Sequence, residues 1–203
     1  MRLTYCVQGT NEQRTTIIMI LDIIKKRRSV FPVQYNGTPI ERADIEKVLE
    51  AANWAPNHKC TEPWRFKVIQ GDAKDRLGAF LAKKYEELDP KPKTSKIKKL
   101  QENPKKAAAI IAICMQRDPK ESLPEWEEIA AVSMAVQNMW LQCTEIGIGS
   151  YWSSPGLIKH MGEFLNLANG EKCLGFFYMG NFDGELNKGK RGSIKAKTEW
   201  ITE

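Results

Sequence analysis

The sequence predicts an α+β or α/β sandwich in which about four strands lie between helices. Two short apolar runs, AAAIIAICMQ and KCLGFFYMGNF, are typical of strands that are buried on both faces. Amphipathic helical patterns come first along the chain and then separate the strands, an order that favours helices packed on a sheet. With 203 residues, of which 42% are hydrophobic, the chain is long enough to bury one such core.

The first half of the chain is expected to be mainly helical. The segment IIMILDIIKKRRS, which begins its pattern at Met19, predicts a helix with a basic last turn. A second helix begins near Glu41 and ends before the proline of NWAPN, because proline disfavours helical geometry in the preceding residue. WRFKVIQG reads as a strand, and Asp72 is a favoured N-cap for a third helix. We expect Trp54 and Trp64 to be core residues that hold the two ends of the intervening loop.

The second half alternates strands with helices. The lysine-rich stretch after Pro90 is expected to be the least ordered segment, and a long helix is expected from about Glu125 to Ile146. GIGSYWSSPG predicts a strand and a turn, and LIKHMGEFLNL predicts another helix. Residues 1–18 read as a disordered N-terminal extension, and residues 19–203 as a single domain.

Several classes of protein do not fit this sequence. It contains neither a Walker A pattern nor a GxGxxG fingerprint, so a cofactor is not expected in a Rossmann crevice. Five scattered cysteines without a CxxC motif are typical of a reducing compartment, which predicts a cytoplasmic location. No secretory signal is recognisable, and polar residues interrupt the longest apolar stretch, which excludes a membrane span. His58 and Cys60 lack a second pair of ligands, so no metal site is expected.

The net charge is +6, which suits an anionic ligand. The basic residues gather in KKRRS, KPKTSKIKKLQENPKK and NKGKRGS. The middle cluster has no interleaved aromatic residues and no recognised nucleic-acid module, so it reads as a solvated face, and no nucleic-acid partner is expected.

Four segments carry side chains suited to binding. Arg27, Arg28 and Ser29 offer forked donors for phosphate oxygens, although the arginines could instead only complement the helix dipole. His58 lies in a loop stiffened by prolines and could face a ligand or be structural. Trp152, Ser153 and Ser154 could bind the polar edge of a planar ring or could form an ordinary turn. The basic tail with Lys188, Lys190 and Arg191 could bind an anion or could be a solvated charge run.

Taken together, these segments resemble the FMN-dependent nitroreductase family. RRSVF, AANWAPNHKCTEPWRF, GIGSYWSSPG and FFYMGNFDGE recur there in this order, and the smaller members share the His-x-x-x-Gln/Glu-Pro-Trp loop. The resemblance covers roughly residues 20–201. It implies an α+β three-layer sandwich with a central mixed sheet of about four to five strands flanked by helices. It also implies an intertwined homodimer with FMN at the subunit interface.

The resemblance assigns cofactor-binding roles by position. Arg27, Arg28 and Ser29 would grip the phosphate side of FMN, and Lys190 and Arg191 would reach the phosphate from the tail. His58 would lie close to FMN, and Glu62 would approach the flavin of the other subunit. Trp152, Ser153 and Ser154 would lie along the isoalloxazine ring. No side chain need be catalytic, because the flavin itself does the chemistry.

The function that this implies is transfer of hydride from NAD(P)H through FMN to a nitroaromatic, a quinone or a similar acceptor. The chain departs from the family at Phe31, where many members carry Arg or Lys near the flavin ring. Either His58 or Lys59 substitutes for that charge, or this flavin is harder to reduce. An ionised Glu62 would lower its potential further. Phe31 and Glu62 favour an alternative function, that of an FMN-binding redox sensor or flavin carrier without significant turnover.

Overall fold

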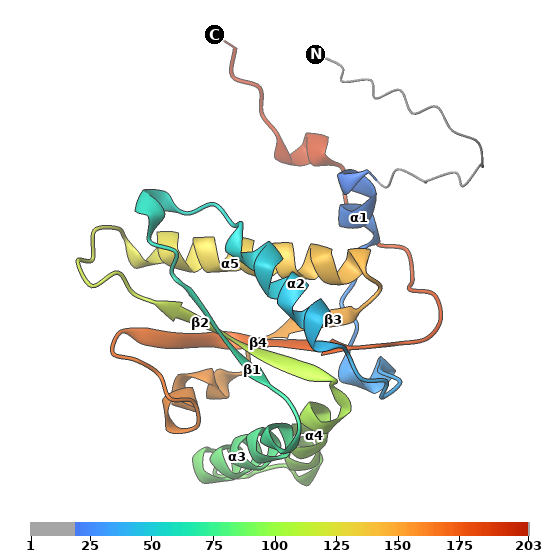
Figure 1. The fold of residues 1–203 in the computed structure, drawn as a ribbon, viewed down its shortest axis with the longest axis vertical. Coiled ribbons are helices and arrows are strands. Elements are labelled where there is room, and N and C mark those ends of the chain that lie inside the picture. Colours follow the sequence, from blue (N-terminus) through green and yellow to red (C-terminus); the bar gives the residue numbers. More distant parts are fainter. Residues whose placement is uncertain (1–18, 203) are drawn as a thin grey trace.

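A computed structural model describes residues 19–202, in which helices cover both faces of one four-stranded sheet (Figure 1). The strand order is β1-β2-β4-β3, formed by β1 (Trp64–Ile69), β2 (Ala109–Gln116), β4 (Glu171–Gly180) and β3 (Gly149–Ser153). All three pairings are antiparallel, so the sheet differs from the expected mixed one. The four strands that the sequence predicts are all present. The predicted extension, residues 1–18, lies outside the described residues.

The two central strands are the centre of the core. Every residue of β2 except the last is buried, and so are the last six residues of β4. α2 (Arg42–Asn53) and α5 (Glu125–Glu145) cover one face of the sheet, and α3 (Asp72–Leu88) and α4 (Thr94–Lys106) cover the other, together with the 3-10 segment η3 (Gly156–Glu163) (Figure 1). The helices expected from Glu41, near Asp72 and over 125–146 are thus confirmed, but Asp72 is the first residue of α3 and not its N-cap, which is Gly71. Where a helix was expected over 157–167, the chain forms the 3-10 helix η3, which ends at Glu163.

The lysine-rich segment after Pro90 is a correction, because most of it forms α4. Leu100 packs against the core between α3 and the sheet, and Pro104 is buried. A Cβ added to Gly78 of α3 would lie 2.7 Å from the carbonyl oxygen of Gln101, so the two helices approach backbone to backbone. This close packing stabilises a helix in a segment that its lysine content had led us to expect to be poorly ordered.

Trp54 is a second correction. Trp64 is buried as expected, but Trp54 is 79% exposed, and its indole N–H donates to Glu50 Oε1 at 2.8 Å. It follows the last residue of α2, where it faces away from the sheet. The prediction that both tryptophans are core residues, which rested on their aromatic side chains alone, is therefore wrong for Trp54.

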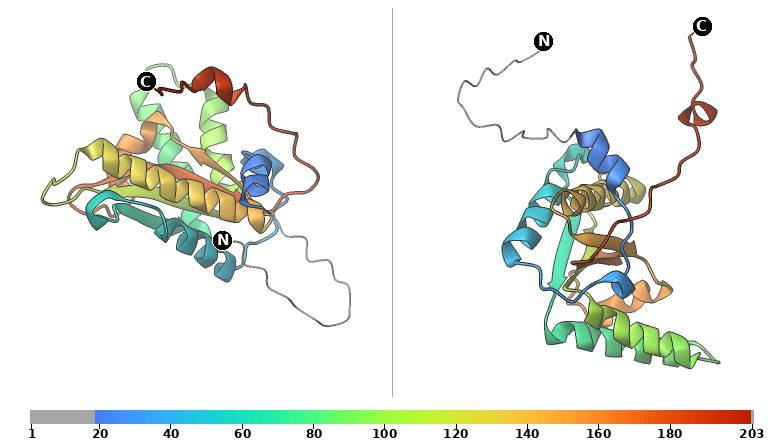
Figure 2. Two further views of the ribbon diagram at one scale, coloured as in Figure 1. Left: turned by 90° about the horizontal axis from the view of Figure 1, so that it is seen from above. Right: turned by 90° about the vertical axis from the view of Figure 1, so that its right-hand side faces the viewer.

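The residues that follow the first helix and the start of the C-terminal tail lie together near the C-terminal end of α5. The short helix α1 (Ile20–Lys26) has no buried residue, and the tail after β4 runs past it and projects from the body (Figure 2). The tail carries the 3-10 turn η4 (Ile194–Lys197), in which no residue is buried, and the exposed Trp200 and Ile201. None of the helices within 19–202 is both long and apolar enough to cross a membrane.

Gly175 allows the indole of Trp152 to pack against β4, and this predicts the effect of adding a methyl group. A Cβ at position 175 would lie 2.4 Å from Trp152 Nε1 and 2.6 Å from the carbonyl oxygen of Ser153, and φ is +149°. Gly175→Ala should therefore lower the free energy of unfolding by about 1–3 kcal/mol, the usual cost of overpacking. Urea denaturation followed by circular dichroism measures it.

Gly156→Ala is the matched control, because a Cβ there meets no atom within 4 Å. This variant should be as stable as the parent or slightly more stable. Equal stability of the two variants would show that Trp152 has room to move away from Gly175.

Candidate functional site

Arg27 and Arg28 follow the last turn of α1 and point to different neighbours. The Arg27 guanidinium lies over the Trp140 ring of α5, with Cζ 4.5 Å from the ring centroid. Arg28 donates from Nε to the carbonyl oxygen of Asn187 at 2.8 Å and from Nη1 to the carbonyl oxygen of Lys25 at 2.8 Å. Arg28 therefore fastens the tail to the end of α1, whereas the Arg27 guanidinium makes no hydrogen bond to an acceptor within the described residues.

The tail brings further positive charge to Arg27. A Cβ added to Gly189 would lie 2.7 Å from Arg28 Cζ, so this glycine allows the tail to cross the guanidinium closely. Burial lowers the pKa of Arg27, and the charges of Arg191 and Arg28 lower it further. Within 19–202, none of these three arginines nor Lys190 takes part in an ion pair. Residues from both ends of the chain thus form a cationic group without a carboxylate partner.

The start of the segment 29–35 lies beside β3 and joins this group to the predicted Trp-Ser-Ser segment. The backbone N–H of Val30 donates to the carbonyl oxygen of Ser150 at 3.0 Å, and the Phe31 ring lies 4.9 Å from the Tyr151 ring. Ser29 and Ser154 are exposed and Ser153 is half-buried. β3 is an end strand of the sheet, and within the described residues no further strand pairs with its outer edge.

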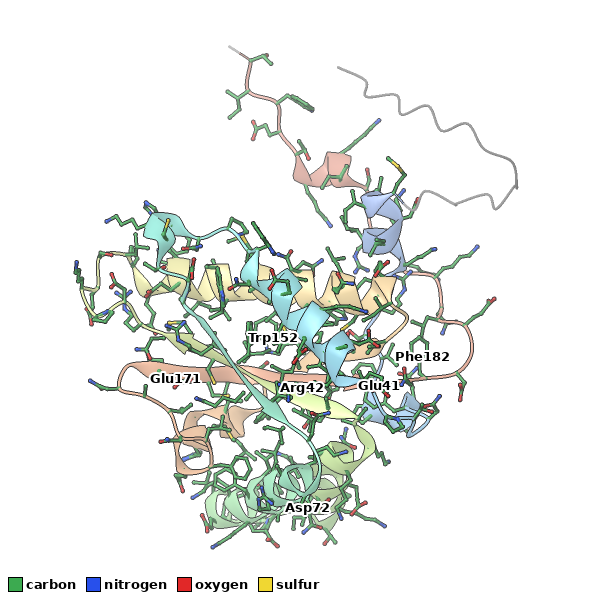
Figure 3. All side chains as sticks on the ribbon, in the orientation of Figure 1. Glu41, Arg42, Asp72, Trp152, Glu171 and Phe182 are labelled. Atoms are coloured by element: carbon green, nitrogen blue, oxygen red, sulfur yellow. The ribbon has the colours of Figure 1, made fainter. Side chains whose placement is uncertain are left out.

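Trp152 itself packs inward. Its indole lies against the core between the sheet and α5, and its N–H is buried without an acceptor in the described structure (Figure 3). A buried donor without a partner costs free energy, so this group is one that a ligand or a water could satisfy. Of the Trp-Ser-Ser segment, Ser154 is exposed, whereas Trp152 and Ser153 are half-buried.

The loop 54–66 lies at the other end of α5. His58 Nδ1 is 2.8 Å from Glu127 Oε2, and Lys59 Nζ donates to the carbonyl oxygen of Ser122 at 2.9 Å. Glu62 is exposed, and its backbone N–H donates to Asn57 Oδ1 at 3.1 Å. Arg27 contacts the same helix thirteen residues further on, at Trp140, which corresponds to about 20 Å along its axis. Within one chain, His58 and Glu62 are therefore not brought together with Arg27.

A pocket of about 630 Å³ opens beside the cationic group, between α1, the α5–β3 turn and the start of the tail. Of the residues that the sequence singled out for binding, Arg28 and Lys188 line it, so sequence reasoning missed most of its wall. Its charged wall consists of Asp22, Lys25, Lys26, Arg28, Glu185 and Lys188. Its size suits a small ligand. Lys25 and Lys26 stand directly before the RRS motif, but a basic helix end gives no signal that distinguishes a pocket wall from a solvated turn.

Comparison with known proteins identifies the family. The model of the family described as "Nitroreductase family" matches residues 24–181. The curated protein "Putative NAD(P)H nitroreductase YfhC" of Bacillus subtilis is 28% identical over 182 residues, which are 88% of this chain and 92% of that protein.

Solved structures agree. A nitroreductase-like family protein from Bacillus cereus superposes with a TM-score of 0.80 at 29% identity, over 92% of this chain and 98% of that one. A nitroreductase with bound FMN from Bacteroides fragilis superposes with a TM-score of 0.66 at 24% identity, over 91% of this chain and 98% of that one. The order of motifs, the sandwich around the antiparallel sheet and the family match agree, and this chain belongs to the nitroreductase family.

Proposed function

We propose that this protein is an FMN-dependent oxidoreductase in which bound FMN carries hydride from NAD(P)H to a nitroaromatic, a quinone or a similar acceptor. The observation that carries the proposal is the group of Arg27, Arg28 and Arg191, in which two of the charges lower the pKa of Arg27 and none of the three, within residues 19–202, forms an ion pair with a carboxylate. A phosphate dianion would supply the missing negative charge. The FMN bound to the relative from Bacteroides fragilis carries such a group.

The side chains present fit the phosphate end of FMN. Arg27 keeps its donors free, since its guanidinium stacks on Trp140 without a hydrogen-bond acceptor. Arg28 donates hydrogen bonds to backbone carbonyl groups, one of them in the tail, and so positions the segment that carries Lys190 and Arg191. Ser29 adds an exposed hydroxyl at the same point. We assign Arg27, Ser29, Lys190 and Arg191 to the phosphate, with Arg28 binding it or holding the others in place.

The flavin ring would lie along the outer edge of β3. Ser153 and Ser154 offer hydroxyl and backbone groups to its polar edge, and the Trp152 indole stiffens the strand from behind. Phe31, which is 48% exposed, presents an apolar surface on the neighbouring segment. In this arrangement the chain binds and orients the ring, and no side chain of the group acts as a nucleophile.

We infer that His58 and Glu62 complete the site from a second copy of the chain. Their distance from Arg27 along α5 excludes them from the same site within one chain. Exposed apolar side chains on three segments suggest the surface that a homodimer would cover. They are Met19, Ile20, Leu21 and Ile24 on α1, Trp126, Ile129 and Met134 on α5, and Trp200 and Ile201 in the tail.

One observation favours the sensor or carrier instead. The Phe31 ring packs on Tyr151 at the position where a cation would stabilise reduced flavin, and no lysine or arginine side chain of the same segment takes its place. A flavin held here would be harder to reduce. Reduction by nicotinamide separates the two functions.

The purified protein should be yellow and should lose its flavin absorbance when NADPH or NADH is added without oxygen. Absorbance spectra before and after each addition measure this and identify the preferred donor. A yellow protein that keeps its absorbance would favour the sensor or carrier. A colourless protein that cannot be reconstituted with FMN would contradict both functions.

Replacing Arg27 should weaken FMN binding. Arg27→Ala removes charged hydrogen bonds to the phosphate, which are worth about 1.5–3 kcal/mol. Titration followed by quenching of flavin fluorescence measures the change. Arg42→Ala is the control, since this exposed arginine lies on α2 and pairs with Glu46. If both variants lose the same amount of FMN affinity, the effect of Arg27→Ala comes from the change in net charge and not from contacts with the phosphate.

A site shared between two copies can be tested by mixing two defective variants. If Arg27→Ala and His58→Ala each bind FMN weakly, exchange of subunits between them creates mixed dimers with one intact site. Tight binding should then return in roughly a quarter of all sites, as random pairing of a two-fold dimer requires. No recovery after verified subunit exchange would contradict a site that Arg27 of one copy shares with His58 of another.

A further inference from the structure

A second group of reactive side chains lies at the end of β4 opposite the tail. Cys114 of β2 and Cys173 of β4 stand directly opposite one another in the antiparallel register. Both belong to the core on the α3 and α4 side of the sheet. Figure 3 shows Glu171, two residues before Cys173, at the end of β4 far from Phe182. The group is therefore separate from the cationic cluster, which lies beyond Phe182.

The backbone places the two thiols within bonding reach. Opposed residues in antiparallel strands have Cα atoms about 4.5–5.5 Å apart, and a disulfide needs about 4.4–6.8 Å. The register shifts between Ile113 and Cys114, so the strands are bulged at the pair. A bulge already departs from the regular ladder and allows the small approach that an S–S bond requires.

Two side chains of opposite charge adjoin the pair: the Glu171 carboxylate raises the pKa of both thiols, and the Lys67 ammonium lowers that of Cys114. Lys67 Nζ lies 3.0 Å from Glu171 Oε1, and the backbone N–H of Ala168 donates to Glu171 Oε2 at 2.8 Å. Burial opposes ionisation of Glu171, but the Ala168 N–H and the Lys67 ammonium hold its pKa below the usual value. The register also sets Arg65 opposite Cys114 on the same face. The Arg65 guanidinium, however, donates to the carbonyl oxygens of Glu62 and Trp64, so Lys67 and the buried Glu171 are the charged groups that act on the thiols.

The two sulfurs are not equivalent. Hydrogen bonding with Cys114 lowers the pKa of the Cys173 thiol, although burial opposes this. The same bond, together with burial, raises the pKa of Cys114. Cys173 also keeps 8% of its surface exposed, whereas Cys114 has none. Cys173 is therefore the sulfur that meets an oxidant first, and Cys114 is placed to resolve the product.

We propose that Cys114 and Cys173 form a redox-active dithiol that hydrogen peroxide oxidises to a reversible intrachain disulfide. The Cys173 thiolate attacks one peroxide oxygen, the O–O bond breaks, and a sulfenic acid and one water result. The Cys114 sulfur then attacks the sulfenic sulfur, the S–O bond breaks, and the second water leaves. Two thiols lose two electrons and two protons, and one peroxide becomes two waters.

Neighbouring features argue against other uses of the pair. Within residues 19–202 no three His, Cys, Asp or Glu side chains are grouped so as to hold a metal ion, so the thiols are not metal ligands there. Cys143 is equally buried in the other half of the core, and burial raises its pKa to about 12. It adjoins Ser150 and provides an internal comparison for a buried but unactivated thiol.

The test uses the full-length protein, reduced with dithiothreitol and then desalted. It is treated with a small excess of hydrogen peroxide, alkylated in denaturant, digested and analysed by mass spectrometry. We expect a disulfide-linked peptide that contains Cys114 and Cys173. The link should disappear when the digest is reduced before mass spectrometry, and Cys143 should be alkylated in every sample. Circular dichroism before and after treatment establishes that the folded protein was oxidised.

Variants define the roles of the two sulfurs. Cys114→Ser should leave a sulfenic acid on Cys173 that dimedone traps, whereas Cys173→Ser should yield neither product, and Cys143→Ser should behave as the parent. If a core variant does not fold, the result on the parent protein decides alone. No linked peptide, or oxidation of Cys143 at the same rate, would overturn the proposal.

Discussion

The packing of α5 on the sheet determines where every part of the candidate site can lie. The helix has 21 residues, so it spans about 30 Å, and it crosses one face of the sheet. Arg27 stacks near its C-terminal end, and His58 pairs with Glu127 in its first turn. Because the core fixes α5, these two groups cannot approach each other in one chain. A site that uses both must be built from two chains.

The N-terminal end of α5 is held rigidly enough to present its half of such a site. Arg117 pairs with the buried Glu128 and fixes the loop before the helix. Lys59, Cys60 and Glu62 adopt positive φ angles of 53°, 52° and 41°, each costing about 1–3 kcal/mol. Strain of that size persists only where the surroundings impose it. The hydrogen bonds from Lys59 to the loop before α5 and from Glu62 to Asn57 supply that constraint.

The sequence was sufficient for those parts of the structure that depend on local pattern. The buried runs at 109–116 and 171–180 and the long helix at 125–145 follow from hydrophobic periodicity, which survives in any tertiary context. It failed where contacts between segments decide. α4 is ordered by its close approach to Gly78, and Trp54 is exposed because α2 ends facing solvent. The proximity of Arg191 to Arg27 likewise depends on the path of the tail. The sequence around Arg27 and the sequence around Arg191 carry no local pattern that predicts this proximity.

The position of Phe31 links the chemistry to assembly. Its ring packs against Tyr151, and the segment 29–35 contains no lysine or arginine that could bring a positive charge to that point. His58 and Lys59, the two residues that could replace the missing charge, are held at the opposite end of α5 by Glu127 and Ser122. Within one chain they are too far away to act on a ring beside β3. Any stabilisation of reduced flavin by these residues must therefore come from the loop of a second copy, and reduction by nicotinamide would then depend on the dimer as strongly as flavin binding does.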